Sequence, residues 1–419
     1  MQDLPERYFK PVSKRRVIYI PGYDPIHPRR YRELYRSESA DQAAISGYEI
    51  GLKPKKSQGP YGWRVKATID GQTTRTDMDV LVWSDIVRDS MDLTIPATYL
   101  QLARTAWTYI ASGTLRRLMW LRKGPVIAAL YPIGMLLLQL ILALWVGSLI
   151  GRGFHYGVQW VLPFLPNMIT GLIGVGLCAA FAIYALRWFK ANDGKFFAYY
   201  LMHDYAYSAK TNGANAPELE ERMAQFGDFI AAALEEDVDE VLVIGHSSGA
   251  HLGVSILADL IRDACVPANG PVLSFLTLGQ VVPMVSFLPE AHRLRADLAY
   301  LCNRPELVWV DVTAPGDGCA FALCDPVAVS GVAPEGGKRW PLVFSAAFTQ
   351  TLSPKRWKEL RWRFFRLHFQ YLCAFDVPAD YDYFQITGGA LSLGARYKDR
   401  APSASRIDVP ASKYTSTAP

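Results

Sequence analysis

The stretch VLVIGHSSGAHLG, residues 241–253, decides how the rest of the chain is interpreted. Apolar residues that favour β-strands run into Gly245-His246-Ser247-Ser248-Gly249. Small and apolar residues of the kind that begin a buried helix follow. The stretch therefore predicts a buried strand, a tight turn containing two serines, and a helix behind the turn.

The turn carries glycine two positions before and two positions after Ser247. Gly-x-Ser-x-Gly between a strand and a helix is typical of a nucleophile elbow, a strained turn that presents a serine hydroxyl. We predict Ser247 as the nucleophile and the N–H of Ser248 as one donor of an oxyanion hole at the helix N-terminus. The alternatives are Ser248 as nucleophile, or a glycine-rich turn with a capping serine. The side chain of His246 is expected to point away from the site.

The composition argues against several classes of protein. Half of the 419 residues are hydrophobic, and the net charge of +5 is spread along the chain. There is no lysine-rich face or zinc-finger spacing, so we expect no nucleic-acid partner. The six cysteines form no C-x-x-C pair, which argues against a disulfide framework and a structural zinc site. The N-terminus lacks the apolar run of a signal peptide, and we expect none.

Two apolar runs interrupt the polar sequence. Residues 124–151 and 153–186 contain no Asp, Glu, Lys or Arg. About 20 apolar residues in a helix cross a bilayer, so both runs are long enough. We predict two transmembrane helices, at about 125–150 and 160–187. The alternative, a pair of buried helices in a soluble protein, is disfavoured because neither run carries a polar stripe.

Basic residues flank the two runs unequally. Those outside the pair are Arg116, Arg117, Arg122, Lys123, Arg187, Lys190 and Lys195, whereas the connecting loop contains Arg152 alone. Because cytoplasmic flanks are enriched in Lys and Arg, we predict an integral membrane protein with two spans. Both termini and the polar parts of the chain are expected in the cytoplasm.

The polar segments alternate between strand and helix patterns, and Asp70-Gly71 between two β-rich runs predicts a hairpin. The predicted fold class is α/β, a mostly parallel sheet covered by helices and interrupted by the two-helix membrane insertion. The expected parts are a first portion of the α/β domain, the membrane hairpin, a second portion of the domain and a flexible tail, at residues 1–112, 113–192, 193–395 and 396–419.

With the GHSSG elbow as its most specific match, the chain resembles the α/β-hydrolase family of serine esterases and lipases, over about residues 15–90 and 193–395. The resemblance implies a second oxyanion donor in the loop after an early strand. In this chain IYIPGYDP occupies that place, with Pro21 where the family often has histidine. The resemblance points to the N–H of Tyr23; the alternative is an ordinary Pro-Gly turn.

The family also implies the chain order serine, acid, histidine. Asp317, in the turn after the predicted strand 307–313, is the favoured acid; Asp311 and Asp325 are alternatives. His368 is the favoured base because no other histidine follows Asp317. Two other histidines follow Ser247: we interpret His251 as a packing residue and His292 as part of a solvated helix face. The segment around His368 has a partly helical pattern.

These features predict a membrane-anchored serine hydrolase that cleaves an ester or thioester, with a lipid or another acyl-chain compound as the expected substrate. Ser247, His368 and Asp317 would form the triad, and Tyr23 and Ser248 the oxyanion hole. No metal or organic cofactor is expected, and the partners are the bilayer and the acyl substrate. The alternatives are an acyltransferase that uses the same triad, and a non-catalytic α/β module that serves as an interaction platform on the membrane.

Overall fold

The computed structural model describes residues 4–23, 27–55, 59–83, 85–86 and 93–419 of the chain. The chain divides into two compact units. The sheet unit comprises Met1–Arg88, Tyr109–Val126 and Thr211–Pro419, and the helical unit comprises Asp89–Thr108 and Ile127–Lys210. The predicted α/β class is confirmed by the sheet unit, which we describe first.

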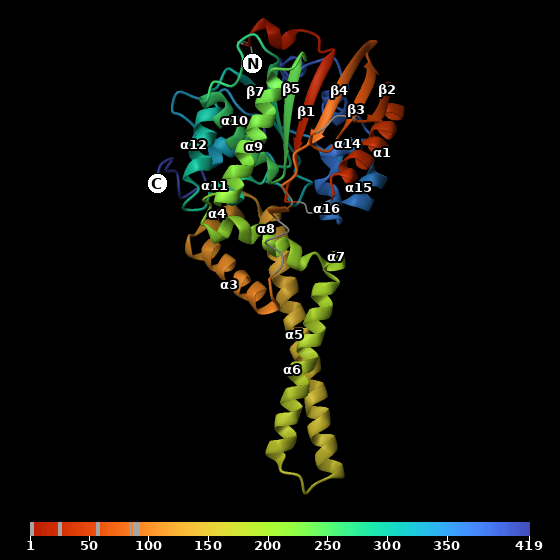
Figure 1. Ribbon diagram of the computed structural model, residues 1–419, viewed down its shortest axis with the longest axis vertical. Helices are drawn as coiled ribbons and strands as arrows, with labels where there is room; N and C mark the ends of the chain where they lie inside the picture. The colour runs from red at the N-terminus through yellow and green to blue at the C-terminus, as the bar shows by residue number, and fades with distance from the viewer. Residues whose placement is uncertain (1–3, 24–26, 56–58, 84, 87–92) are drawn as a thin grey trace. The chain divides into compact units, whose positions relative to one another are not determined.

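An eight-stranded sheet lies in the order β2-β3-β4-β1-β5-β6-β7-β8 (Figure 1). The pairs that involve β1, β5, β6, β7 and β8 are all parallel, whereas β2, β3 and β4 pair antiparallel with one another. The strands are β1 Lys14–Ile20, β2 Glu49–Pro54, β3 Gly62–Ile69, β4 Gln72–Val80, β5 Glu240–His246, β6 Val272–Leu278, β7 Leu307–Thr313 and β8 Leu342–Ser345.

The burial pattern along the strands explains their positions. Every residue of β5, β6 and β7 is buried, as expected for central parallel strands covered on both faces. β3 alternates between buried and exposed positions, as expected for a strand with one solvated face. At the predicted hairpin between β3 and β4, Asp70 has φ 52° and Gly71 has φ 74°, the left-handed conformations that Asp and Gly tolerate.

Helices cover the sheet. α10 packs on β5 with α9 and α12 beside it, and α17 and α18 pack on other strands. The helices of this unit are η1 Glu6–Phe9, α1 Arg29–Ser46, α4 Thr114–Leu121, α9 Pro217–Leu234, α10 Gly249–Arg262, α11 Val282–Ser286, α12 His292–Leu301, α13 Pro326–Val329, α14 Phe348–Thr351, α15 Pro354–Leu360, α16 Phe364–His368, η2 Gln370–Leu372, α17 Tyr383–Gly388 and α18 Leu393–Arg396.

The C-terminal segment differs from the expected flexible tail. Residues 396–419 lie along the sheet unit and are bound through their backbone. The N–H of Ile407 donates to the Leu323 carbonyl at 2.7 Å, and the N–H of Ala411 donates to the Val329 carbonyl at 2.9 Å. Because backbone hydrogen bonds rather than a periodic apolar face attach the segment, its side-chain pattern does not reveal the attachment.

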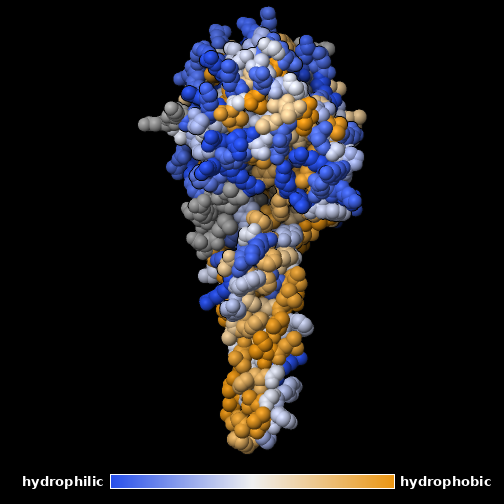
Figure 2. All heavy atoms as spheres, turned by 90° about the vertical axis from the view of Figure 1, so that its right-hand side faces the viewer, coloured by the Kyte–Doolittle hydropathy of each residue, from blue (hydrophilic) through white to orange (hydrophobic). Residues whose placement is uncertain are grey.

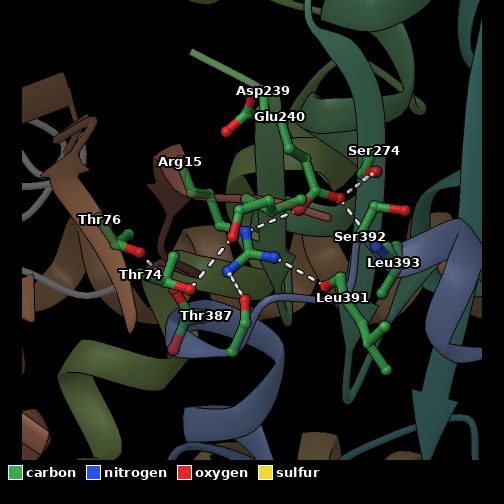
Figure 3. Close-up of polar contacts among 12 residues, drawn as sticks. Arg15, Thr74, Thr76, Asp239, Glu240, Ser274, Thr387, Leu391, Ser392 and Leu393 are labelled. Carbon is green, nitrogen blue, oxygen red and sulfur yellow. Dashed lines mark hydrogen bonds and ion pairs between the residues drawn. The ribbon is translucent and has the colours of Figure 1, made fainter. Parts of the chain in front are cut away.

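A buried ion pair ties the amino-terminal end of the sheet together (Figure 3). Arg15 Nε donates to Glu240 Oε2 at 2.6 Å, and both side chains are fully buried. The other guanidinium nitrogens donate to the carbonyls of Gly389 and Leu391, each at 2.8 Å. Glu240 Oε1 also accepts from Ser274 Oγ at 2.6 Å and from the N–H of Leu393. The network therefore joins β1, β5 and β6 to the chain around α18.

The helical unit contains α6 Asn167–Ala191 and most of α5 Lys123–Val161, and both helices are long and apolar enough to cross a bilayer. α5 is longer than the predicted 125–150, whereas α6, with 25 residues, begins and ends later than the predicted 160–187 and is slightly shorter. The unit also contains α7 Asp193–Phe196, α8 Ala198–Lys210 and most of α3 Ile95–Ala111. Figure 2 shows hydrophobic residues over much of the surface of α5 and α6, where Ile141, Trp145, Leu172 and Val175 are exposed.

Glycines let α5 and α6 approach closely. A Cβ atom added to Gly151 would lie 2.3 Å from the carbonyl oxygen of Gly174, and one added to Gly174 would lie 2.7 Å from that of Gly151. One turn earlier, a Cβ on Gly147 would lie 2.7 Å from the Cys178 carbonyl oxygen. Small residues at four-residue spacing permit this backbone contact, as in pairs of transmembrane helices.

Candidate active site

The candidate site is built around Ser247, in the turn between β5 and α10. Ser247 has φ 56°, a left-handed conformation that non-glycine residues seldom adopt. Its N–H donates to the Leu278 carbonyl at 2.9 Å, and its carbonyl accepts from the N–H of Ala250 at 3.1 Å. These bonds on both sides hold the strained turn in place.

The glycines on either side of the turn are required by close backbone contacts. A Cβ on Gly249 would lie 2.1 Å from the carbonyl oxygen of Ile20 and 2.6 Å from that of Pro21. A Cβ on Gly245 would lie 2.7 Å from Ala250 Cα. The Gly-x-Ser-x-Gly spacing is therefore a steric requirement of this turn, since any side chain at either glycine would force the strand and helix apart.

The end of β1 lies beside the serine hydroxyl. A Cβ on Gly22 would lie 2.9 Å from Ser247 Cβ and 3.3 Å from Ser247 Oγ. Trp83 holds this Pro-Gly turn, because its Nε1 donates to the Pro21 carbonyl at 2.9 Å and its ring makes an edge contact with Tyr23. The Gly22–Tyr23 backbone, which the family resemblance implied as the source of an oxyanion donor, is thus next to Ser247.

Ser248 follows the serine directly and precedes the first turn of α10. Backbone N–H groups at such a position have no acceptor within their own helix. Ser248 itself is buried, whereas Ser247 is half-buried and keeps access to solvent. Of the two serines, Ser247 therefore has the accessible position.

The structure brings Asp317 and His368 together across 51 positions of sequence. His368 Nδ1 lies 2.7 Å from Asp317 Oδ2. Because a carboxylate accepts, Nδ1–H donates and Nε2 of the neutral ring is left free to take a proton. Asp317 Oδ1 accepts from the N–H of Cys319 at 2.9 Å, which fixes the plane of the carboxylate.

Tyr371 holds the same carboxylate from another side. Its hydroxyl donates to Asp317 Oδ2 at 3.0 Å and accepts from the N–H of Ala314 at 3.0 Å. Burial, and then the charge of Asp317, raises the pKa of Tyr371 well above its usual value, so the hydroxyl keeps its proton. Tyr371 was not recognisable from the sequence, in which its position three residues after His368 is the only signal.

Gly279 completes this cluster. It follows β6 with φ 53°, and a Cβ there would lie 3.1 Å from His368 Cε1 and 3.3 Å from Asp317 Oδ2. The same atom would lie 2.7 Å from the Tyr371 ring. Nothing in the sequence pattern distinguished this glycine, although a side chain at this position would displace the acid–base pair.

His246 does not point away from the site as expected. Its ring stacks on that of His368, with centroids 4.9 Å apart and planes 26° apart. Its Nε2 lies 3.1 Å from the His368 carbonyl and its Nδ1 lies 2.9 Å from the Tyr19 hydroxyl. Burial, and then the nearby His368, lowers the pKa of His246 well below its usual value. The neutral ring therefore donates from Nε2 and accepts at Nδ1.

Ser247 Oγ and His368 are not hydrogen-bonded to each other in the part of the chain that the structure describes. They are linked through His246, which precedes Ser247 and stacks on His368. In enzymes without substrate, the nucleophile–base hydrogen bond is often long and tightens on binding. The structure thus brings the acid and base into direct contact and places the serine turn beside them.

The two alternative acids have other partners. Asp311 lies inside β7, where its Oδ1 accepts from Thr277 Oγ1 at 2.5 Å and burial raises its pKa to about 8. Asp325 caps α13 by accepting from the N–H groups of Val327 and Ala328, and it forms an ion pair with Lys338. Neither is hydrogen-bonded to His368, whereas Asp317 is.

The remaining downstream histidines lie elsewhere. His251 is buried in α10, where desolvation lowers its pKa to about 4, and its Nδ1 has no hydrogen bond within the described residues. His292 begins α12 and pairs with Glu290 at 3.5 Å. The burial of His251 agrees with a packing role. His292 is half-buried, and its Nδ1 lies 3.3 Å from the Ser416 carbonyl, so its ring is not fully solvated as expected.

Asp317, Cys319 and His368 have donor atoms within 4.8 Å of one another, and these are ligand types that Zn²⁺ accepts. The nitrogen and oxygen of the His368–Asp317 pair are, however, hydrogen-bonded to each other. Burial also raises the pKa of the Cys319 thiol well above its usual value, which disfavours the thiolate that a metal binds. The cluster fits an acid–base pair better than a metal centre.

Comparisons with protein-family models, with curated proteins and with solved structures find no match for this chain. The interpretation of the site therefore depends on its own geometry and chemistry.

Proposed function

We propose that the protein is a membrane-anchored serine hydrolase of the α/β-hydrolase type that cleaves carboxylic esters or thioesters. The observation that carries the proposal is the 2.7 Å pairing of His368 Nδ1 with Asp317 Oδ2 beside a serine held at φ 56° between a strand and a helix. A buried carboxylate that fixes the tautomer of a histidine near a strained serine is the arrangement that activates a hydroxyl for acyl transfer.

In the proposed mechanism, Ser247 Oγ attacks the acyl carbon while His368 Nε2 takes its proton. Asp317 stabilises the imidazolium through the Nδ1–H bond. The ester C–O bond then breaks, and His368 returns the proton to the leaving alkoxide or thiolate. Water repeats the sequence on the acyl-enzyme, which releases the carboxylic acid and restores Ser247.

The negative charge of the tetrahedral intermediate requires donors close to Ser247. We assign this role to the N–H groups of Ser248 and Tyr23. The position of Ser248 at the N-terminus of α10 supports the first assignment, and the contact of Gly22 with Ser247 supports the second. The N-terminal end of α10 adds positive potential at the same place.

The topology also supports the proposal. The serine follows β5, the acid follows β7 and the histidine follows β8, which is the chain order serine, acid, histidine of α/β-hydrolases. α5 and α6 would anchor the enzyme as a membrane hairpin with both flanks in the cytoplasm. Extraction of the protein by alkaline carbonate without detergent would contradict that anchor.

The central experiment replaces Ser247 with Ala and measures turnover of p-nitrophenyl butyrate by the full chain in detergent. We expect a loss of at least about a thousandfold, as is usual for a catalytic serine. Labelling by a fluorophosphonate should disappear in the same variant. Ser248→Ala keeps the backbone N–H and should retain most of the turnover, which separates the two serines. Unchanged turnover and labelling in Ser247→Ala would reject the proposal.

A further inference from the structure

An exposed aromatic and basic segment precedes the candidate base. It covers α15, the following turn and the start of α16, and we call it the aromatic–basic strip. Trp362 is 72% exposed, Phe364 46% and Phe365 43%. The cations of the strip are Lys355, Lys358, Arg361 and Arg363, all exposed.

The cations of the strip have no acidic partner within 4 Å in the described part of the chain. Their neighbours Arg356 and Arg366 differ, because both pair with Glu38. Arg361 lies 5.6 Å over the Trp362 ring. Exposed tryptophan and phenylalanine interspersed with arginine and lysine that lack an acidic partner are typical of surfaces that meet the headgroup region of a membrane.

The strip lies directly against the loop that carries Asp317. Phe364 packs on Gly318 so closely that a Cβ on that glycine would lie 3.0 Å from the ring. In the same way, a Cβ on Gly316 would lie 2.8 Å from the Trp357 ring. α16, which begins in the strip, ends at His368. A ligand bound by the strip would therefore sit beside the candidate acid and base.

A second aromatic and basic group belongs to the same unit and reaches the same loop. A Cβ on Gly124 would lie 3.2 Å from the Gly318 carbonyl oxygen, and Arg122 Nε donates to the Ala322 carbonyl at 2.9 Å. The exposed members of this group are Arg116, Trp120 and Lys123, and Arg116 lies 5.0 Å over the Trp120 ring. Gly318 is thus contacted by both groups. In Figure 1, α4 and α16 lie at the same end of the sheet.

We propose that these two groups form one surface that binds anionic lipid headgroups, and that the substrate is an acyl ester of an anionic membrane lipid. This inference depends on the proposed function. The cations would bind the phosphate or carboxylate of the headgroup, and the aromatic rings would enter the interfacial layer. The ester bond of the bound lipid would then lie beside Ser247. Hydrolysis adds one water to that bond and yields a fatty acid and the deacylated lipid.

The test uses the full chain reconstituted into vesicles of phosphatidylcholine with increasing phosphatidylglycerol. A fluorogenic phosphatidylglycerol ester reports lipid hydrolysis, and p-nitrophenyl butyrate reports turnover of a soluble ester in the same vesicles. The informative quantity is the ratio of the two rates. In the wild type we expect this ratio to rise with phosphatidylglycerol content and to fall with added salt.

Arg361→Gln/Arg363→Gln should lower the ratio by about twenty-five-fold, which corresponds to about fivefold for each cation removed. Trp362→Ala should also lower it. The matched control is Lys66→Gln/Arg75→Gln, which removes two exposed charges from β3 and β4, away from the loop that carries Asp317. The control should keep the wild-type ratio.

This inference would be overturned if the ratio of the two rates did not change with phosphatidylglycerol content, or if the strip substitutions left the ratio unchanged. That conclusion would hold even if soluble esters are hydrolysed. Equal hydrolysis of a neutral lipid ester in the same anionic vesicles would overturn the anionic substrate. Turnover of both reporters by Ser247→Ala would instead reject the proposed function. The two failures are therefore distinguishable.

Discussion

The imidazole of His246 stacks on that of His368, with ring centroids 4.9 Å apart and Nε2 within 3.1 Å of the His368 carbonyl. The residue that precedes the candidate nucleophile therefore contacts both the ring and the backbone of the candidate base. Although the two residues lie 122 positions apart, this contact joins the end of β5 to the end of α16. His246 is well placed to position His368 relative to Ser247.

His246→Leu should lower kcat on p-nitrophenyl butyrate about tenfold or more, because loss of a single donor that aligns a base costs about 1–3 kcal/mol. KM should change little, since His246 is buried and its ring nitrogens contact Tyr19 and the His368 carbonyl. His246→Gln can still donate to the His368 carbonyl and should recover part of the rate. A loss of thermal stability without these kinetic changes would indicate a purely structural role.

Tyr371→Phe should lower kcat by about tenfold, since it removes a hydrogen bond to a carboxylate, worth about 1.5–3 kcal/mol. Asp317 would keep its bonds to His368 and Cys319, so activity should fall without vanishing. Tyr35→Phe is the matched control, because it removes the buried hydroxyl bonded to Thr387 at 2.8 Å. Both variants should lose stability, and equal kcat losses in the two would argue against positioning of Asp317 by Tyr371.

Asp311 should make stability fall as pH rises. Burial raises its pKa in the folded chain to about 8, above the usual 3.8, so the folded state holds a proton that the unfolded state has released. The contribution of protonated Asp311 to the free energy of unfolding is fully present below pH 3.8. It is lost as the pH rises from 3.8 to about 8, by at most about 1.4 kcal/mol per pH unit. Thermal unfolding in detergent from pH 5 to 9 should show this decline in the wild type relative to Asp311→Asn. A constant difference between the two would contradict it.

Glu240→Gln should destabilise the sheet unit by about 3–5 kcal/mol, because it leaves the fully buried Arg15 without a counter-charge. Lys14, which precedes Arg15, and Asp237, which lies three residues before Glu240, form an exposed ion pair. Asp237→Asn is therefore the control and should cost about 1 kcal/mol or less. The measurement is the denaturant midpoint of each variant in detergent. Similar losses of stability in the two variants would mean that the buried ion pair contributes no more than the surface pair.

Gly151→Leu and Gly174→Leu should each loosen the packing of α5 against α6. Overpacking of a close contact costs about 1–3 kcal/mol. Gly153 and Gly171 have open space at their Cβ positions, so Gly153→Leu and Gly171→Leu are the controls. All four changes gain similar helix propensity, which leaves helix packing as the difference. In micelles, Gly151→Leu and Gly174→Leu should unfold at lower temperatures than the two control variants. Equal unfolding midpoints for all four variants would contradict the close glycine contact.

The sequence predicted those elements whose pattern is local. β5 and α10 were recognisable because the apolar run, the Gly-x-Ser-x-Gly turn and the helix start are contiguous. α5 and α6 followed from two charge-free runs. The hairpin at Asp70-Gly71 followed from the left-handed conformation that its turn requires. The attachment of residues 396–419 was missed because backbone bonds leave no periodic signature in side chains.

The candidate site shows the same division. The order of residues along the chain nominated His368 and three possible acids, but only the packing of β7, β6 and α16 brought Asp317 within 2.7 Å of the ring. Tyr371, Gly279 and the orientation of His246 were decided entirely by tertiary contacts. Secondary structure and membrane segments depend on neighbours a few residues apart, whereas hydrogen-bond partners at a site are chosen by which strand ends the fold places together. The amino-acid order of this protein therefore determined the parts, and the folded sheet determined which of their side chains meet.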